Sequence, residues 1–451
     1  MLPRSSIPGV DWPPVPDAAG ATTLALAWQL EQTQWWPAAK LRAHQELQLR
    51  RLLAHAATTT EHYAGRIDAA RPLDELPLLT RHELIAAGPR MLSKRYPLQH
   101  GAAPETVTSR STGEPVRVRV PGIVASFWNA ITLRDHTWHR RDLTARLAAI
   151  RHTRDDTGDQ APPPDGARAA GWGPATADVV PDAPLSMLSV ASTTAEQIAW
   201  LVREAPAYLL VYPTVLGAMC RLMAATGARV PSLRQVRTVS EALSPETRAL
   251  CRDVLGVALV DTYSAQECGY IALQCPEHEH YHVQSERLLV EILDDEGRPC
   301  APGAVGRVVV TDLHNFATPL VRYELGDYAE VGEACACGRG LPVLTRIVGR
   351  RRGMLAYRDG RTAWPVFTVA CRDAAPYLEC QLVQDAIDQL RLRVVPSPAR
   401  PLEEHHRAAL VGALHGALGA DFAVTIEVVD AIGRTPAGKL EEFVSHVPPR
   451  S

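Results

Sequence analysis

The chain has 451 residues, of which 46% are hydrophobic and 22% are charged, and its formal net charge is −3. A chain of this length is too long for one ordinary hydrophobic core, so the sequence predicts a globular protein of two or three domains. The small net charge and the scattered arginines give no sign of a nucleic acid or a membrane surface as partner, and we expect neither.

The compartment is predicted from apolar stretches and cysteines. Residues 1–10 hold no apolar stretch of signal-peptide length, and no run of about 18 apolar residues occurs, so we expect no transmembrane helix and a cytoplasmic location. In that compartment the nine cysteines are expected to be thiols or metal ligands rather than disulfides.

The first part of the chain is predicted to be mainly helical. Apolar residues recur at helical spacing from about residue 20 to residue 65. A polar loop, T-S-R-S-T-G-E-P at 108–115, precedes V-R-V-R-V, whose alternation predicts a strand. S-F-W-N-A-I-T-L-R-D-H-T-W-H predicts a helix whose aromatic residues line a pocket or pack in the core. Residues 152–184, rich in Asp, Gly, Pro and Ala, predict a surface loop or a partly disordered insert.

Helix and strand signals alternate after this insert. Helices are expected at A-E-Q-I-A-W-L-V-R-E, at V-L-G-A-M-C-R-L-M-A-A and at S-P-E-T-R-A-L-C-R-D-V-L, the last capped by Ser244; strands are expected at Y-L-L-V-Y, V-R-T-V-S and V-A-L-V-D-T-Y. Such alternation is typical of an α/β sheet with parallel strands. Residues 287–331 predict strands and turns without a helix, and the final part of the chain predicts a small α+β module.

Four further segments follow the polar loop: S-E-A-L-S-P-E at 240–246, D-T-Y-S-A-Q-E-C-G at 261–269, Y-E-L-G-D-Y at 323–328 and G-R-T-P-A-G-K-L at 433–440. Each is unspecific alone. Together with T-S-R-S-T-G-E-P, and in this order, they resemble the adenylate-forming superfamily of acyl-CoA synthetases, adenylation domains and luciferases. T-D-L-H-N-F-A-T-P-L-V-R-Y-E-L-G-D, the C-A-C-G-R that follows and D-G-R-T-A-W-P-V-F resemble the phenylacetate-CoA ligase branch. The resemblance covers roughly residues 20–445.

The resemblance implies both a fold and a reaction. The fold is α/β: residues 1–349 form a large N-terminal adenylation domain of mixed and parallel sheets flanked by helices, with a β-rich subdomain. Residues 350–451 form a small mobile α+β C-terminal domain that carries a catalytic lysine. The reaction is ATP-dependent activation of a carboxylic acid as an acyl-adenylate, with release of pyrophosphate. The acyl group then passes to an acceptor, by default the thiol of CoA, and Mg²⁺ accompanies ATP.

The resemblance also assigns roles to residues. Glu267 holds Mg²⁺ between phosphates, Tyr263 stacks on adenine, and Asp327 takes the ribose hydroxyls. Lys439 neutralises charge as the α-phosphorus is attacked, and Lys439 and Glu267 are the expected catalytic residues. Each has a structural alternative, such as an exposed loop lysine or a core tyrosine, but the order of the motifs favours the functional role. The other nucleotide-binding residues are Thr108, Ser109, Arg110, Ser111, Thr112, Gly113, Ser240, Glu241, Ser264 and Arg350.

The polar loop departs from the family pattern at Arg110, where glycine is usual, and after Pro115, where the usual lysine is missing. Arg110 restricts the backbone of the loop but adds a bidentate phosphate donor. We therefore predict a working but altered loop, in which ATP handling changes rather than the fold.

A second group of residues has the spacing of metal ligands. C-P-E-H-E-H-Y-H begins at Cys275, and C-A-C-G begins at Cys335. Two thiolates one residue apart, with an earlier cysteine and histidine, can form a tetrahedral zinc site, and some members of the resembled branch carry such a structural zinc. We predict Cys275, Cys335, Cys337 and His282 as ligands, with His278 and His280 as competing histidines. Four protein ligands leave no open position for substrate.

A hinge is expected after Gly349-Arg350, where Arg351 or Arg352 takes the place of the usual aspartate or lysine. The three consecutive arginines can instead bind a phosphate of CoA or be solvated. The acid is expected to be an aryl or other compact carboxylic acid. Its pocket residues are predicted to be Phe127, Trp128, His136 and Tyr212, with Trp138 or His139 contributing.

Other functions stay open at this stage. The acceptor can be a carrier-protein thiol, an amine, or nitrite in diazotisation, as in a natural-product pathway. A catalytically decayed ligase fold that acts as a binding protein is a further alternative. A zinc hydrolase that uses Glu279, His280 and His282 is disfavoured, because the sequence lacks H-E-x-x-H spacing. A homodimer is compatible with the sequence.

Overall fold

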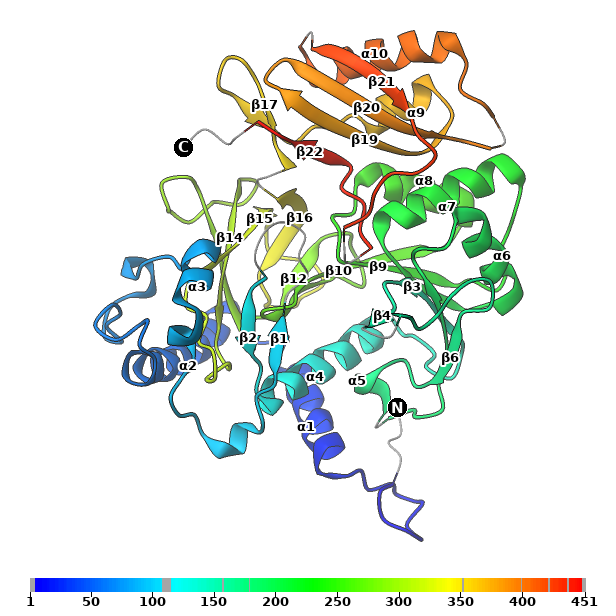
Figure 1. Ribbon diagram of the computed structural model, residues 1–451. Coiled ribbons are helices and arrows are strands. Elements are labelled where there is room, and N and C mark those ends of the chain that lie inside the picture. The colour runs from blue at the N-terminus through cyan, green and yellow to red at the C-terminus, as the bar shows by residue number, and fades with distance from the viewer. Residues whose placement is uncertain are drawn as a thin grey trace. The chain divides into compact units, whose positions relative to one another are not determined.

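The computed structural model describes residues 5–107, 115–155, 158–177, 179–350, 353–398, 400–420, 422–435 and 438–447. Figure 1 traces the elements along the chain. The chain divides into two compact units. Unit 1 comprises Met1–Thr144, Ala170–Pro184 and Thr262–Ile347, and unit 2 comprises Ala145–Ala169, Leu185–Asp261 and Val348–Ser451.

Unit 1 contains the first helices of the chain. The single helical stretch predicted from the spacing is two helices, α1 (Ala18–Thr33) and α2 (Ala38–Thr59), because Pro37 has no backbone N–H with which to continue α1. The predicted aromatic-rich helix is confirmed as α4, and α1 packs against it. The other helical segments of this unit are α3 (Arg81–Ala87), α4 (Gly122–Trp138), α5 (Pro174–Ala177), η1 (Leu73–Glu75), η2 (Gly88–Met91) and η3 (Leu98–His100).

The strands of unit 1 form a sheet in the order β13-β14-β15-β16-β12-β11-β10. The strand pairs β13/β14, β14/β15, β12/β16, β11/β12 and β10/β11 are antiparallel. The prediction of strands without a helix over 287–331 is confirmed. The bounds are β1 (Glu105–Val107), β2 (Arg117–Arg119), β11 (Gly269–Gln274), β12 (Tyr281–Val283), β13 (Leu288–Leu293), β14 (Val305–Asp312), β15 (Tyr323–Val331), with β10 (Ala258–Ala265) and β16 (Val343–Arg350) crossing the unit boundary.

Unit 2 contains the predicted parallel α/β sheet. Strand β3 pairs in parallel with β7 and β8, and β8 pairs in parallel with β9, with a helix between consecutive strands from β7 onward. The Ser244 side chain caps α8, as predicted, by accepting a hydrogen bond from the Thr247 N–H. The bounds are β3 (Leu147–Arg151), β6 (Ala167–Ala170), β7 (Pro184–Ser189), α6 (Thr194–Glu204), β8 (Tyr208–Val211), α7 (Pro213–Thr226), β9 (Gln235–Val239) and α8 (Pro245–Leu255).

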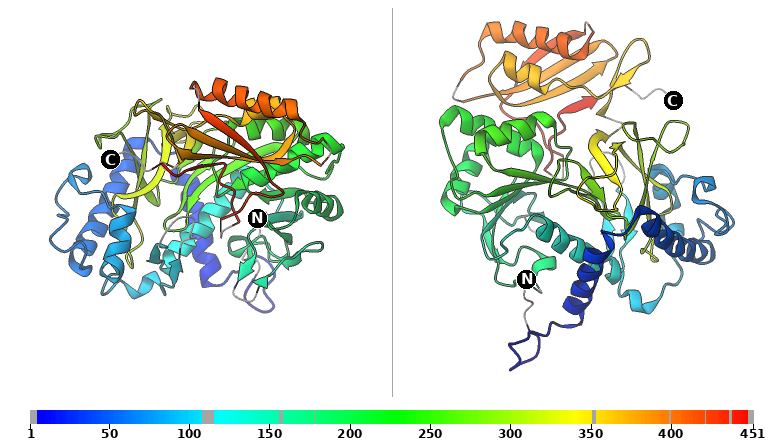
Figure 2. Two further views of the ribbon diagram at one scale, coloured as in Figure 1. Left: turned by 45° about the horizontal axis from the view of Figure 1, so that its top comes forward. Right: turned by 180° about the vertical axis from the view of Figure 1, so that it is seen from behind.

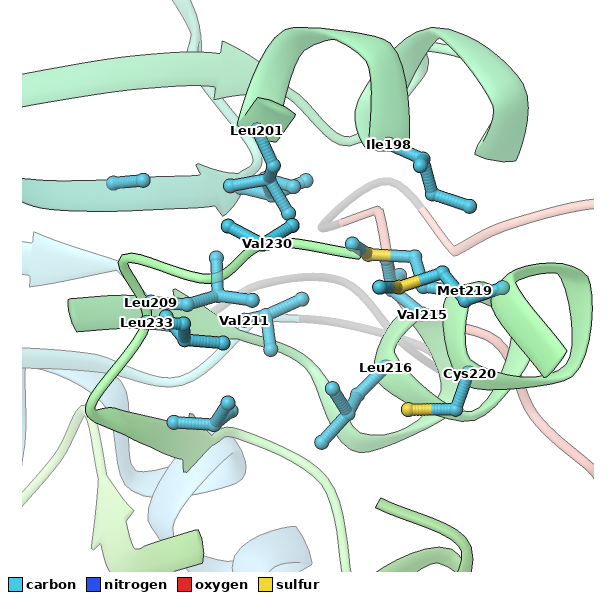
Figure 3. Close-up of a cluster of buried hydrophobic side chains, with 14 of the residues drawn as sticks. Ile198, Leu201, Leu209, Val211, Val215, Leu216, Met219, Cys220, Val230 and Leu233 are labelled. Atoms are coloured by element: carbon cyan, nitrogen blue, oxygen red, sulfur yellow. The ribbon is translucent and has the colours of Figure 1, made fainter. Parts of the chain in front are cut away.

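The core of this sheet consists of aliphatic side chains from α6, α7 and β8. Figure 3 shows Ile198 and Leu201 of α6 and Leu216 of α7 close to Leu209 and Val211 of β8. Burial of such side chains supplies most of the favourable free energy of folding. The apolar residues of the sequence therefore predicted both helices: α6 buries one face, and α7 is buried over most of its surface.

The segment at 152–184 differs from the predicted loop. It contains the short strands β4 (Arg154–Asp155) and β5 (Gly158–Asp159), as well as β6 and α5. Ala161 is fully buried and its carbonyl oxygen accepts a hydrogen bond from the Ser189 N–H, while Trp200 Nε1 donates to the carbonyl oxygen of Asp165. These contacts with distant residues order a segment whose composition resembles that of a loop.

The C-terminal part of unit 2 is the predicted α+β module, a sheet in the order β21-β20-β19-β22. Helices α9 and α10 lie on one face of it (Figures 1 and 2), and Leu410 and Leu414 of α10 are buried with Leu382 and Leu392 of the sheet. The bounds are β17 (Leu355–Ala356), β18 (Thr362–Ala363), α9 (Thr368–Ala374), β19 (Tyr377–Ala386), β20 (Gln389–Pro396), α10 (Glu404–Leu418), β21 (Ala423–Val428) and β22 (Phe443–Ser445).

A buried ion pair lies in unit 1. Arg287 donates to the carboxylate of Asp312 over 2.7 Å and also to the carbonyl oxygen of Cys268, and both charged side chains are almost completely buried. Burial raises the pKa of Asp312, and the guanidinium of Arg287 opposes this shift. No helix in the described part of the chain is both long and apolar enough to cross a membrane.

We predict that Arg287→Met destabilises the protein by about 3–5 kcal/mol, because Asp312 then stays buried without a cation. Arg287→Met combined with Asp312→Leu should recover most of this loss. Urea unfolding measures the effect. The control is Arg298→Met, which breaks an exposed pair with Asp294 and should cost less than about 1 kcal/mol. Equal losses in the two single variants would contradict the prediction.

Candidate functional site

The turn between β10 and β11 in unit 1 carries Glu267. Gly269 ends the turn with a φ of +81°, a conformation that favours glycine, and a Cβ there would lie 2.9 Å from Arg287 Nη1. Arg287 also donates to the carbonyl oxygen of Cys268, one residue earlier in the turn. The backbone around Glu267 is therefore fixed by its own conformation and by a buried cation.

Tyr263 and Asp327 are brought together in unit 1. The Tyr263 hydroxyl donates to Asp327 Oδ2 over 2.9 Å. Tyr263 stands in β10, where the register shifts between Tyr263 and Ser264, and Asp327 stands in β15. A shift of this kind turns the following side chain out of strict alternation. The two residues predicted to contact adenine and ribose are thus direct neighbours.

Arg81 is a residue that the sequence did not single out. Its Nη1 lies 3.4 Å from Glu267 Oε1, and it occupies the first position of α3, after the Thr80 capping box. A cation at a helix N-terminus is unfavourable with respect to the helix dipole. The ion pair with Glu267 offsets this effect, and no local pattern in the sequence indicated it, because the two residues lie 186 positions apart.

Ser240 and Glu241 follow β9 in unit 2. Ser240 has a φ of +74°, which is uncommon for a residue with a side chain and marks a constrained turn. Glu241 Oε2 accepts hydrogen bonds from the N–H and the hydroxyl of Thr214, at 3.0 Å and 2.8 Å. The carboxylate thus lies at the N-terminus of α7, where a negative charge is favourable.

Lys439 lies in a tight turn of unit 2. The Thr435 N–H donates to the carbonyl oxygen of Lys439 over 2.9 Å, and the Lys439 N–H donates to the Thr435 hydroxyl over 3.1 Å. Gly438 has a φ of +77°, and a Cβ there would lie 2.4 Å from Val190 Cγ1. The glycine therefore allows the turn to lie directly against Val190. The next N–H, of Leu440, donates to Glu241 Oε1 over 3.2 Å.

The other residues predicted to bind the nucleotide are Arg350, Ser264 and those of the polar loop. Arg350 ends β16 in unit 2, where its carbonyl oxygen accepts a hydrogen bond from Trp364 Nε1 over 3.2 Å. Ser264 stands in β10. Thr108, Ser109, Arg110, Ser111, Thr112 and Gly113 lie outside the described residues, as do Arg351 and Arg352.

The predicted pocket residues differ in burial. Phe127 is buried with its ring 4.4 Å from that of His314, and Trp128 is partly exposed and adjoins Gly269 of the β10–β11 turn. His136 is buried and hydrogen-bonded to Arg141. In unit 2, the Tyr212 hydroxyl accepts from the His152 N–H over 3.3 Å. Trp138 Nε1 donates a hydrogen bond to Gln34 Oε1, and His139 Nε2 is hydrogen-bonded to the carbonyl oxygen of Gln274. The role of these residues in binding an acid stays a prediction.

Four predicted metal ligands come together in unit 1. One ligand atom each from Cys275, His282, Cys335 and Cys337 lies within 4.8 Å of the others. The Sγ atoms of Cys275 and Cys335 are 3.9 Å apart, and Cys337 Sγ is 3.4 Å from His282 Nε2. Zinc–sulfur bonds of about 2.3 Å at tetrahedral angles separate two sulfurs by about 3.8 Å. The distances between the ligand atoms therefore fit a zinc ion. Of the three histidines considered, His282 is the one whose ring nitrogen lies beside the sulfurs.

The cysteine cluster contacts the end of α1. Gln34 Oε1 accepts hydrogen bonds from Arg339 Nε over 2.9 Å and from Trp138 Nε1 over 2.8 Å, and the Gly340 N–H donates to the Gln34 carbonyl oxygen. Burial raises the pKa of the Cys337 thiol, but the N–H of Arg339, the side chain of Cys335 and the guanidinium of Arg339 together more than offset it, so that the pKa is lowered. Arg339 therefore favours the thiolate, which is the metal-binding form.

Comparison with known proteins gives partial matches in sequence and nearly complete matches in fold. No family model matches the chain. The phenylacetate-coenzyme A ligase of Thermus thermophilus is 32% identical over 163 residues, which are 33% of this chain and 36% of that protein. The chain thus matches only about a third of the length of this curated relative.

Two solved structures show the fold. A 2-hydroxyisobutyryl-CoA ligase in the postadenylation state, in complex with R3-HIB-AMP, has a TM-score of 0.72 at 18% identity, covering 92% of this chain and 91% of that chain. An anthranilate CoA ligase, AuaEII, in complex with anthranoyl-AMP has a TM-score of 0.56 at 18% identity, covering 74% and 64%. The predicted resemblance is confirmed at the level of fold: the chain has the fold of adenylate-forming acyl-CoA ligases.

Glu442 is a carboxyl group of unit 2 with a perturbed pKa. Burial raises its pKa to about 7; Arg221 of α7 opposes the shift, and the carboxylates of Glu241, Glu246 and Glu379 add to it. Because the pKa is higher in the folded chain than in the unfolded chain, the stability that Glu442 contributes is complete below pH 4.5 and is lost as the pH rises to about 7.

We predict that Glu442→Gln stabilises the protein at pH 8 by about 2 kcal/mol and has little effect at pH 5, where the folded carboxyl group is already neutral. Unfolding by urea at the two pH values measures the difference. Glu404→Gln, at an exposed position of α10, is the control and should have no pH-dependent effect. A stabilisation of equal size at both pH values would contradict the prediction.

Proposed function

We propose that the protein is an AMP-forming ligase, which activates a carboxylic acid with ATP and passes the acyl group to the thiol of CoA. The observation that carries this proposal is the hydrogen bond between Tyr263 and Asp327, beside the turn that holds Glu267. It joins an aromatic ring and a carboxylate that the motifs assign to adenine and ribose. The shared fold and the motif order support the same assignment.

Two displacement steps follow from this assignment. A carboxylate oxygen of the acid attacks the α-phosphorus, the bond from that phosphorus to the β-phosphate oxygen breaks, and pyrophosphate leaves with the bonding electrons. The CoA thiol then loses its proton to solvent and its sulfur attacks the acyl carbon. The bond from that carbon to the phosphate oxygen breaks, and AMP leaves with the bonding electrons. Lys439 neutralises negative charge on the phosphorus centre in the first step. Such a cation is effective only where the loop holds it in place.

Glu267 suits a magnesium ion bound together with the phosphates of ATP. Mg²⁺ usually takes one or two protein carboxylates plus phosphate oxygens, and when bound it neutralises phosphate charge. Glu267 Oε1 is paired with Arg81 at 3.4 Å, a long contact between a partly exposed guanidinium and a buried carboxylate. Because the contact is long, we propose that the carboxylate is shared between Arg81 and a magnesium ion bound with ATP.

The substrate is proposed to be an aryl or other compact acid, with Phe127, Trp128, His136 and Tyr212 as candidate pocket residues. Trp128 is the best supported of these, because its ring adjoins the Glu267 turn and is partly exposed. The 2-hydroxyisobutyryl and anthranilate acids of the similar structures are both compact.

The first test is ATP–pyrophosphate exchange with Mg²⁺ and without CoA, against a panel of aryl, aliphatic and hydroxy acids. We expect exchange with at least one compact acid. Lys439→Ala should lower that exchange at least about 100-fold, because charge stabilisation at the transition state is lost. Lys94→Ala, at an exposed lysine paired with Glu61, is the matched control and should exchange normally. No exchange with any acid would favour a decayed fold that only binds its ligands.

We also propose that Cys275, His282, Cys335 and Cys337 hold a structural zinc ion. The purified protein should contain about one zinc per chain by mass spectrometry, because the four donors complete a tetrahedral shell. Cys337→Ser should lower the zinc content and the melting temperature, while Cys300→Ser, a partly exposed cysteine outside the cluster, should change neither. Equal zinc content in both variants would contradict the assignment. Loss of turnover on zinc removal with an unchanged melting temperature would instead indicate a catalytic metal.

A further inference from the structure

We infer that Glu241 is a positioning residue for Lys439 and not a ligand of the nucleotide; this inference rests on the proposed function. Both carboxylate oxygens already have partners in unit 2. Oε2 accepts from the N–H and the hydroxyl of Thr214, and Oε1 accepts from the N–H of Leu440, the residue after Lys439. The carboxylate therefore connects the N-terminus of α7 to the turn that carries the lysine.

The Glu241 carboxylate is a strong acceptor for the hydrogen bond from the Leu440 N–H. Hydrogen bonds from backbone N–H groups to an ionised acceptor are about twice as strong as those between neutral groups. Glu241 is partly buried. Burial raises its pKa, while the donors on Thr214 and the charges of Lys439 and Arg434 oppose the shift. Burial is the largest of these effects, so the pKa of Glu241 is raised overall, while its hydrogen-bond donors and the two cations favour the charged form.

The turn itself is shaped to meet Glu241. The Gly438 N–H donates to the carbonyl oxygen of Thr435 over 2.8 Å, and Gly438 lies so close to Val190 that a side chain would collide. Since Lys439 is the next residue, its Cα is held between the contact with Val190 and the hydrogen bond from Leu440 to Glu241. Loss of the hydrogen bond removes the attachment that directly follows Lys439.

Helix α7 provides a second connection to the same part of unit 2. Arg221 Nε donates to the carbonyl oxygen of Leu378 over 2.6 Å, and Arg434, which precedes the Lys439 turn, forms an ion pair with Glu379. Glu379 is the neighbour of Leu378 in β19. The C-terminal sheet is therefore placed by α7 through Arg221, while the lysine turn is placed by α7 through Thr214 and Glu241. Of these two connections, the one through Thr214 and Glu241 ends beside Lys439.

This arrangement predicts different effects on the two half-reactions. Adenylation needs Lys439 at the phosphorus centre, so it depends on the hydrogen bond between Glu241 and Leu440. Attack of the CoA thiol on an adenylate that is already formed does not use Lys439 in the proposed mechanism. A substitution at Glu241 should therefore slow the first half-reaction and spare the second. A nucleotide ligand would act differently, because its loss would weaken ATP binding.

The test uses Glu241→Gln in the full-length protein. Glutamine can still accept from Thr214 through its oxygen, but its NH₂ group then faces the Leu440 N–H, so that this hydrogen bond is lost. Hydrogen exchange in peptides that cover 438–445 measures the loss directly, and we expect the Leu440 amide to exchange about 10- to 100-fold faster. Glu246→Gln, in the first turn of α8, is the matched control and should leave this amide unchanged.

The kinetic arm uses the acid that gives ATP–pyrophosphate exchange. In Glu241→Gln the kcat of exchange should fall about 10- to 100-fold with the KM for ATP within about 2-fold. Thioester formation from the synthetic adenylate of that acid and CoA should stay within about 2-fold of the unsubstituted protein. Thr214→Val, which removes one donor to Glu241, should give a smaller effect of the same kind and serves if Glu241→Gln does not fold.

The outcomes separate the inference from the proposed function. Unchanged exchange of the Leu440 amide, a raised KM for ATP, or an equal fall in both half-reactions would overturn the role of Glu241. If the unsubstituted protein activates no acid, the proposed function fails. The hydrogen-exchange arm then still decides whether Glu241 holds the Lys439 turn.

Discussion

The position of Glu267 depends on Arg287, a residue outside every motif. Its guanidinium is buried, and a buried cation must be paired to be tolerated. It donates to the carboxylate of Asp312 and to the carbonyl oxygen of Cys268, which belongs to the turn that carries Glu267. The requirement to pair a charge in the core therefore fixes the backbone of the turn. The turn at the end of β10 is therefore held by an ion pair whose own role is structural.

Elements with strong periodicity could be predicted from the sequence, and those that depend on distant contacts could not. Helices α6 and α8 bury one face each and α7 is buried over most of its surface, and the apolar spacing and the cap at Ser244 indicated all three correctly. The break at Pro37 was missed because apolar spacing continues across it, although proline cannot continue a helix. The burial of residues such as Ala161 within 152–184 was not predicted, because Ala161 is held by a hydrogen bond from Ser189, which lies further along the chain.

The same division holds for the candidate site. The order of the motifs predicted Tyr263, Glu267, Asp327 and Lys439 as site residues, and the structure brings Tyr263 and Asp327 together. The residues that hold them in place were not identified: the contact from Arg81 to Glu267 joins positions 186 residues apart. Such a partner leaves no local pattern. The cysteine cluster is the exception, because the chemistry of zinc allows few ligand types and spacings.

The cysteine cluster also has a consequence for the unfolded chain. Cys275 and Cys335 are 60 residues apart, and the strands β13, β14 and β15 lie between them. A metal ion held at both ends would close this segment into a ring, and a cross-link of that length removes about 4 kcal/mol of unfolded-state entropy in the chain-entropy model. The enclosed strands pair mostly with their sequence neighbours. With the ring closed, this antiparallel sheet would be a local folding unit, which other parts of the chain can join afterwards.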